Sequence, residues 1–258
     1  MPRLVSIKLA LACALVLLTA LSVAGPVAAA PSSAQSPHLR VIGKGGKVLA
    51  ERFVGIPKRI SVKTSPKATC LGAGTGGSGK SVKVRGNTAL GLLVKASQSI
   101  AALRPLSLTD HFLSEFGLGL CGIGKSKATR TLSWYLKVNH KNPNLGGEAV
   151  KVKPGDEVLW ALEPYPYPEE LVLGAPLSAQ PGVPFEVTVL SYDDKGKKKP
   201  AVGATVTGAS LPTDAGGHTM VTLTAEGTLV ATLGKDIPSK GAHVTMCLSS
   251  VPCPIITP

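Results

Sequence analysis

Apolar and polar residues alternate along two runs in the middle of the chain, which is the pattern of half-buried β-strands. The residues that share one side of each run are Trp134, Leu136 and Val138, then Val158, Trp160 and Leu162. Val150 and Val152 form a shorter run between them, followed by Lys153–Asp156, where Pro154 and Gly155 suit a type II turn. This predicts a hairpin between the short run and the strand at Val158.

Upstream, the same alternation in Leu39–Ile42 and Val48–Val54 flanks Gly43–Gly46 and predicts an opening hairpin. One helix is predicted, starting at Asn87 or Thr88 and ending before Pro105. Its apolar stripe consists of Leu90, Leu93, Val94 and Ala101.

Alternation resumes after a proline-rich segment, residues 163–168, which predicts a stiff linker because proline lacks the N–H that a ladder needs. The alternating residues beyond it are Phe185, Val187, Val189, Val202, Ala204, Val206, Thr219, Val221, Leu223, Leu229, Ala231, Leu233, Val244 and Met246. The predicted fold class is therefore mainly β. An α+β domain spans residues 38–162, and an all-β sandwich spans residues 169–258.

Three motifs in the first domain resemble the transcobalamin-like C-terminal domain: the Trp134–Asn139 run, the pair Gly146 and Gly147, and the Pro154–Trp160 end. The upstream residues that occur in the family's order are Cys70, Asn87, Thr88, Ala89, Leu90 and Cys121. The resemblance covers about residues 38–165 and implies a β-grasp fold. In vitamin B12 carriers such a module forms half of the cobalamin site, and this chain lacks the all-helical barrel that supplies the other half.

In the second domain, Gly203–Val206, Thr213–Gly217 and Leu229–Ala231 resemble bacterial immunoglobulin-like domains over about residues 168–250. That resemblance implies a role in spacing or adhesion. The segment from Cys247 to Cys253 departs from the common pattern of those domains.

The first thirty residues predict a signal peptide. Arg3 and Lys8 precede an apolar run, Leu9–Ala24, and Ala28–Ala30 offers small residues for cleavage. A membrane helix is the alternative, but the run is short and ends in Gly-Pro. We expect a secreted or envelope-associated protein with a disordered start at residues 31–37 and no transmembrane segment after cleavage.

The chain is basic, with a formal net charge of +13. Losing Arg3 and Lys8 with the signal peptide leaves about +11, which favours anionic partners such as a cell-wall polymer or an envelope protein. The densest basic cluster is Lys195, Lys197, Lys198 and Lys199. Its alternative role is to keep an inter-strand loop soluble. Nucleic acid is not expected, because ten Phe, Trp and Tyr residues in the whole chain are too few for a stacking platform.

Four cysteines remain after signal cleavage: Cys70, Cys121, Cys247 and Cys253. An even number in an exported chain predicts two disulfides, and three pairings are possible. Domain order favours Cys70 with Cys121 and Cys247 with Cys253. A metal site formed by His243, Cys247 and Cys253 is the alternative at the C-terminus, although a fourth ligand is missing.

No catalytic, cofactor-binding or metal-binding residues are predicted. Gly74–Ser81 matches the phosphate-loop pattern, but the strand-like Ser81–Arg85 follows it where a helix is required. The neighbours Asp110 and His111 are interpreted as surface residues, since successive residues of a strand point to opposite faces.

The candidate contact surface is the loop Asn139–Gly147, a polar segment anchored by the aromatic residues before it. The candidate ligand-contact residues are Trp134, Tyr135, Asn139, Asn142, Asn144 and Trp160. The favoured function is a non-catalytic binding or interaction protein of the cell exterior. A carrier of a cobalamin-like small ligand, acting with a partner protein, is the alternative, and an ordinary connecting loop is the simplest explanation of the polar segment.

Overall fold

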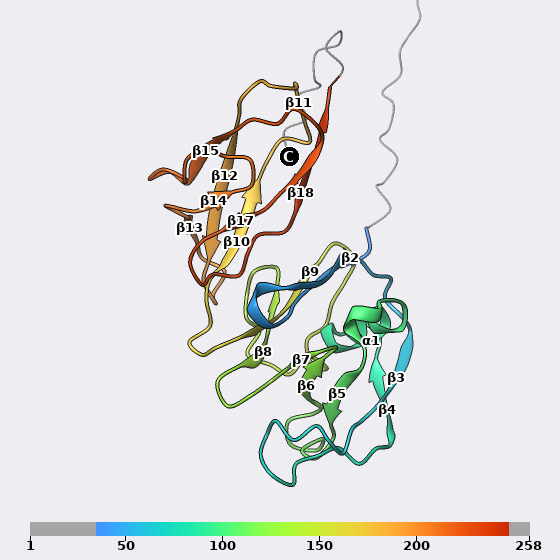
Figure 1. The fold of residues 1–258 in the computed structure, drawn as a ribbon. Coiled ribbons are helices and arrows are strands. Elements are labelled where there is room, and N and C mark those ends of the chain that lie inside the picture. Colours follow the sequence, from blue (N-terminus) through green and yellow to red (C-terminus); the bar gives the residue numbers. More distant parts are fainter. Residues whose placement is uncertain (1–34, 248–258) are drawn as a thin grey trace, which may run out of the picture. The chain divides into compact units, whose positions relative to one another are not determined.

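Both long alternating runs belong to one four-stranded sheet in the computed structural model, which describes residues 35–247 (Figure 1). Its strands are β1 (His38–Ile42), β2 (Val48–Phe53), β8 (Ser133–Val138) and β9 (Glu157–Glu163), in the order β2-β1-β9-β8. β1 and β9 pair in parallel and the outer strands are antiparallel. The predicted opening hairpin is confirmed, with a 3-10 turn η1 (Lys44–Gly46) between its strands.

One face of this sheet lies on a hydrophobic core with the helix. The sheet residues buried in that core are Leu39, Val41, Ala50, Leu136, Val158 and Trp160. The predicted helix is confirmed as α1 (Ala89–Ser99), which packs against β3 (Arg59–Lys63) and β4 (Ser81–Arg85) (Figure 1). It ends earlier than predicted because Ile100 is extended, so Ala101 lies in a separate 3-10 turn, η2 (Ala101–Leu103).

Three short strands complete the first half: β5 (Leu106–Thr109), β6 (Gly119–Ile123) and β7 (Ser126–Lys127). The predicted disulfide between Cys70 and Cys121 is present and ties the segment after β3 to β6. The predicted partner of Cys247, Cys253, lies outside the described residues, as does the predicted signal peptide.

The hairpin predicted between Val150–Val152 and β9 is wrong. The turn itself is present, with Gly155 at φ 87° and the Asp156 N–H donating to Lys153 O over 3.1 Å. However, Ala89 N–H donates to Val150 O and Leu90 N–H donates to Gly147 O, both over 2.9 Å. The first amides of a helix lack partners inside it. They bind this segment, and β9 pairs with β1 and β8 instead.

Nine strands occupy residues 170–246: β10 (Glu170–Gly174), β11 (Ser178–Ala179), β12 (Phe185–Tyr192), β13 (Lys198–Pro200), β14 (Thr205–Val206), β15 (His218–Val221), β16 (Gly227–Leu229), β17 (Ala231–Thr232) and β18 (Ala242–Met246). They form the sheets β10-β12-β13 with β15 on β12, β11-β18-β16, and β14-β17. Lys198 and Lys199 belong to β13, which pairs with β12. The inter-strand loop predicted at residues 195–199 is therefore shorter than expected, a tight turn between these two strands.

The second hydrophobic core contains most of the residues predicted from alternation in this half, including Val187, Val189, Val206 and Leu229. A third cluster joins Ile42, Tyr135, Leu159 and Ala161 of the four-stranded sheet to Ile237. The predicted mainly β fold class is confirmed. No helix within residues 35–247 is long and apolar enough to cross a membrane.

The proline-rich segment connects β9 to β10. Tyr167 stacks on Tyr135, with ring centroids 4.0 Å apart, and its hydroxyl lies 2.8 Å from Ser133 Oγ. At the other end of the first half, Gln35 O and Pro37 O, within the predicted disordered start, accept hydrogen bonds from Gly155 and Val54.

Candidate functional site

Five of the six predicted ligand-contact residues line one cavity of about 300 Å³: Trp134, Tyr135, Asn142, Asn144 and Trp160. The other lining residues are Leu90, Leu118, Leu120, Leu136, Leu145, Gly146, Gly147 and Tyr167. We call this space the tryptophan cavity. Trp134 Nε1 and Trp160 Nε1 are both buried without a hydrogen-bond partner among the described residues.

The tryptophan cavity forms where the loop 139–147 returns over the edge strand β8. Gly147 is required at the closest approach, because a Cβ there would lie 2.5 Å from Trp160 Cη2. The Leu90 N–H, at the start of α1, donates a hydrogen bond to Gly147 O over 2.9 Å. The helix N-terminus therefore fixes the end of the loop that covers the indole ring.

Asn139 does not line the tryptophan cavity. Its side-chain amide donates to Asp156 Oδ1 over 3.0 Å, and its Oδ1 accepts the Glu157 N–H over 2.9 Å. Its φ is +49°, and His140 and Asn144 also have positive φ. Asparagine tolerates this left-handed conformation better than most residues. The role that the structure supports for Asn139 is to shape the loop.

The loop 139–147 lies beside the basic cluster Lys195–Lys199, which we call the lysine turn. Asn142 N–H donates to Asp194 O over 2.9 Å, and the Tyr135 hydroxyl donates to the Asp194 carboxylate. The Lys141 side chain passes over Gly196, where a Cβ would lie 2.5 Å from Lys141 Cγ. Burial raises the pKa of Tyr135, as does the bond to Asp194, so the phenol stays protonated as the donor.

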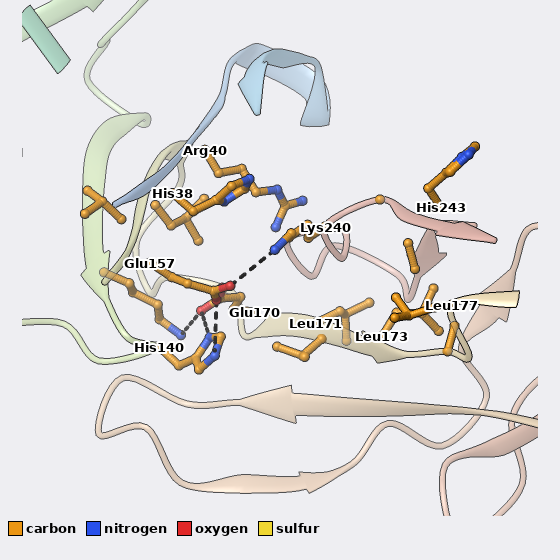
Figure 2. A pocket seen from close by; sticks show the side chains of 17 residues that line it. His38, Arg40, His140, Glu157, Glu170, Leu171, Leu173, Leu177, Lys240 and His243 are labelled. Atoms are coloured by element: carbon orange, nitrogen blue, oxygen red, sulfur yellow. Dashed lines mark hydrogen bonds and ion pairs between the residues drawn. The ribbon is translucent and has the colours of Figure 1, made fainter. Parts of the chain in front are cut away.

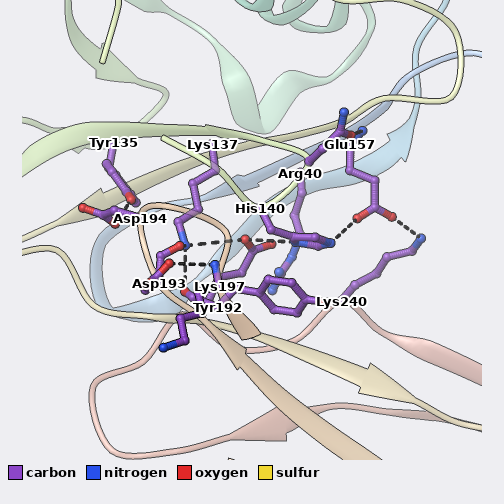
Figure 3. Close-up of polar contacts among 12 residues, drawn as sticks. Arg40, Tyr135, Lys137, His140, Glu157, Tyr192, Asp193, Asp194, Lys197 and Lys240 are labelled. Atoms are coloured by element: carbon purple, nitrogen blue, oxygen red, sulfur yellow. Dashed lines mark hydrogen bonds and ion pairs between the residues drawn. The ribbon is translucent and has the colours of Figure 1, made fainter. Parts of the chain in front are cut away.

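The second face of the four-stranded sheet carries buried charges (Figure 3). Lys137, on β8, is fully buried. Its ammonium donates to Tyr192 O over 2.9 Å and to Asp193 O over 3.1 Å, and lies 3.8 Å from Glu170 Oε2. Burial lowers the pKa of Lys137, while Glu170 opposes that shift. The carbonyls and the carboxylate together replace the water that a buried ammonium loses.

His140 lies between two carboxylates of this face. Its Nδ1 is 3.2 Å from Glu170 Oε2 and its Nε2 is 3.6 Å from Glu157 Oε2. Burial acts to lower the pKa of His140, but the Glu170 and Glu157 carboxylates outweigh it and leave the pKa raised. Lys240 Nζ lies 3.4 Å from Glu157 Oε1. We call Lys137, His140, Glu157, Glu170 and Lys240 the charge network.

The charge network was not predicted from the sequence. Alternation places Arg40 and Lys137 on the face opposite to the core, where charged residues are normally solvated. The spacing of Arg40 and Lys137 predicts that they share this face of the sheet. It does not predict that β10 and the segment 237–240 cover the face. The available signal was a set of apolar residues on that same face, which consists of Ile42, Tyr135, Leu159 and Ala161.

The loop that matches the phosphate-loop pattern serves a structural role. Asp110 accepts hydrogen bonds from the Ser78 amide and hydroxyl, both over 2.6 Å, and Gly77 N–H donates to Ser65 O over 2.8 Å. The strand β4 follows the loop directly, as predicted, where the phosphate-loop pattern requires a helix.

Comparisons with family models, with curated proteins and with solved structures find no match. The resemblances to the transcobalamin-like and immunoglobulin-like domains stay predictions.

Proposed function

We propose that this chain is an exported, non-catalytic binding protein, and that its tryptophan cavity and lysine turn contact an anionic polymer of the cell envelope. The observation that carries the proposal is the hydrogen bond from Asn142 to Asp194, which holds the loop 139–147 beside the lysine turn. Two features predicted separately, the candidate contact loop and the densest basic cluster, are thereby neighbours in space.

The tryptophan cavity supplies the recognition of a polymer unit. Its walls combine two indole rings with the amides of Asn142 and Asn144, the mixture of apolar surface and few polar groups that is typical of small-ligand sites. An unpaired buried N–H is costly. A ligand oxygen that reaches the unpartnered Trp134 or Trp160 N–H would remove that cost.

The lysine turn supplies attraction for negative charge. Lys141 and the four lysines at 195–199 face Asp193, Asp194 and Glu169, which leaves a local surplus of two positive charges. Lys199 is already bound to Glu169 over 2.8 Å. Lys141, Lys195, Lys197 and Lys198 are exposed and make no ion pair with a described residue, so all four are available to a phosphate or carboxylate of the polymer.

The sheet order supports the β-grasp assignment on which the expected role rests. β1 and β9 form a parallel inner pair flanked by antiparallel β2 and β8, with α1 across one face. The exported state is supported by the predicted signal peptide and by the Cys70–Cys121 disulfide, because disulfides persist mainly in oxidising compartments.

The test is a titration of the purified protein with soluble poly(glycerol phosphate), followed by intrinsic fluorescence. The chain has two tryptophans and both line the tryptophan cavity, so the emission reports on this site alone. We expect saturable quenching that weakens with salt, because exposed charges are screened. The double variant Lys197→Gln/Lys198→Gln should weaken binding by about tenfold, and Asn144→Ala should reduce the fluorescence change.

The matched control is Lys58→Gln/Lys83→Gln, which removes the same charge from two exposed positions, one just before β3 and one on β4. Equal weakening by both double variants would reduce the interaction to net charge and contradict a specific site. Quenching by aquocobalamin but not by the polymer would favour the cobalamin-like carrier instead.

A further inference from the structure

A second cavity, of about 490 Å³, lies on the other face of the four-stranded sheet (Figure 2). Its charged lining residues, which are Arg40 and the charge network, gather at one end together with His38. Leu171, Leu173 and Leu177 line the other end. We call it the amphipathic cavity. Its volume falls within the range of about 300–1,000 Å³ that is usual for small-molecule sites.

His38 is a buried polar side chain at the charged end, only 7% exposed. Its ring packs edge-on against Phe53, with centroids 5.0 Å apart, and makes no hydrogen bond to any described residue. Burial lowers the pKa of His38, and the nearby Lys240 charge adds to that effect. A neutral imidazole has one donor and one acceptor nitrogen, so His38 adds an unused donor to the residues that line the cavity.

Lys240 is the cation that a ligand can reach. Its side chain is 46% exposed, and that of its partner Glu157 is 44% exposed. Exposed ion pairs contribute little stability, so an incoming anion can replace Glu157 at small cost. The other cations are held more firmly, because Arg40 donates to Ser239 O over 2.8 Å and pairs with Glu51, and Lys137 is bound to carbonyls.

The opposite end is mainly aliphatic and partly open, and the exposed His243 lies at the same end (Figure 2). Leu171 is buried, Leu173 is half-buried and Leu177 is 57% exposed at the rim. Ala175 and Ala242 add small side chains to the same wall. An apolar wall that ends in an exposed leucine favours a flexible hydrocarbon chain, since covering it removes apolar surface from water.

We propose that the amphipathic cavity binds a medium-chain fatty acid, with the carboxylate on Lys240 and His38 and the chain along Leu171, Leu173 and Leu177. A monocarboxylate matches the one reachable cation and the imidazole donor, and the chain matches the leucine end. The proposal concerns a different cavity from the tryptophan cavity and does not depend on the polymer.

The test is isothermal titration of the purified protein with decanoate, and separately with decanol and decyltrimethylammonium. We expect decanoate to bind more tightly than either. Lys240→Gln should weaken decanoate binding by about tenfold, the loss of one charge-assisted contact. Glu157→Gln should strengthen it, because the competing carboxylate is gone. A cationic ligand would reverse both effects.

Matched controls separate the site from general effects. Lys235→Gln changes an exposed lysine on the same segment as Lys240 but outside the cavity, and should leave binding unchanged. Leu177→Asn should weaken binding, whereas Leu211→Asn, at an exposed leucine elsewhere, should not. Tighter binding of the ammonium amphiphile, or decanoate affinity that neither Lys240→Gln nor Leu177→Asn changes, would overturn the proposal.

Discussion

Glu163, the last residue of β9, is a half-buried carboxyl whose pKa is raised by burial to about 7. Its folded pKa lies above the unfolded value, so the folded state holds the proton more tightly. The stability contributed by this group is therefore fully present below about pH 4.5, falls as the pH rises, and is lost above about pH 7.

We predict that Glu163→Gln stabilises the protein by about 1–3 kcal/mol at pH 8 and has little effect at pH 4, because the amide cannot ionise. Thermal unfolding at both pH values measures this. Glu226→Gln, at an exposed carboxylate, is the control and should change neither value. The same stabilisation at both pH values would show that the ionisation of Glu163 is not its cause.

Single residues differ in how far the sequence predicts their role. Trp134 and Trp160 were placed correctly on the core face, because alternation fixes which side of a strand a residue occupies. Asn139, a predicted ligand-contact residue, does not line the tryptophan cavity and forms hydrogen bonds with Asp156 and Glu157, an arrangement that depends on where the chain folds back. The burial of Lys137 was not predicted, because its partners are backbone carbonyls more than fifty residues away, and no local sequence pattern indicates such contacts.

Elements were predicted best where local chemistry decides them. Thr88 caps α1 as the helix signal indicates: its hydroxyl accepts the Gly91 N–H over 3.1 Å and donates to Arg85 O over 2.7 Å. The short run Val150–Val152 was misassigned because the first amides of α1 compete for it, which is a tertiary effect.

Removing this cap should destabilise the protein. Thr88 is buried, so Thr88→Ala leaves the Gly91 N–H and Arg85 O without their partner and should cost about 1–2 kcal/mol. Thr88→Ser keeps the hydroxyl and should retain most of that stability. Chemical denaturation compares the two variants. Equal losses in both would mean that the lost methyl group, and not the cap, matters.

The disulfide acts at the scale of elements, since it joins the segment after β3 to β6 across a separation of 51 residues. On the chain-entropy model, a loop of this length contributes about 4 kcal/mol. We expect Cys70→Ser/Cys121→Ser to lose about that much stability in denaturant unfolding. Addition of a reductant should destabilise the wild type much more than this double variant, and equal sensitivity would contradict the assignment.

At the scale of the whole molecule, the four-stranded sheet is tied to the later strands by buried polar contacts in addition to apolar ones. Lys137 reaches the end of β12, and Arg40 reaches Pro238 and Ser239. The burial of Lys137 and Arg40 favours this one arrangement of the strands, because a buried charge that loses its partners costs far more free energy than a lost apolar contact. The two hydrophobic cores were predicted from the sequence. The junction between them, formed by the contacts of Lys137 and Arg40, was not, because the partners of these residues lie far away in the chain.

The junction should make the two cores unfold together. We predict one calorimetric transition for the wild type. Lys137→Ala takes one cation from Glu170 and one donor each from Tyr192 O and Asp193 O. It should cost about 3–5 kcal/mol and separate the transition into two. Lys83→Ala, at an exposed lysine of β4, is the control and should unfold as the wild type does. A single transition at the wild-type temperature for Lys137→Ala would show that the apolar cluster around Ile237 is enough to couple the cores.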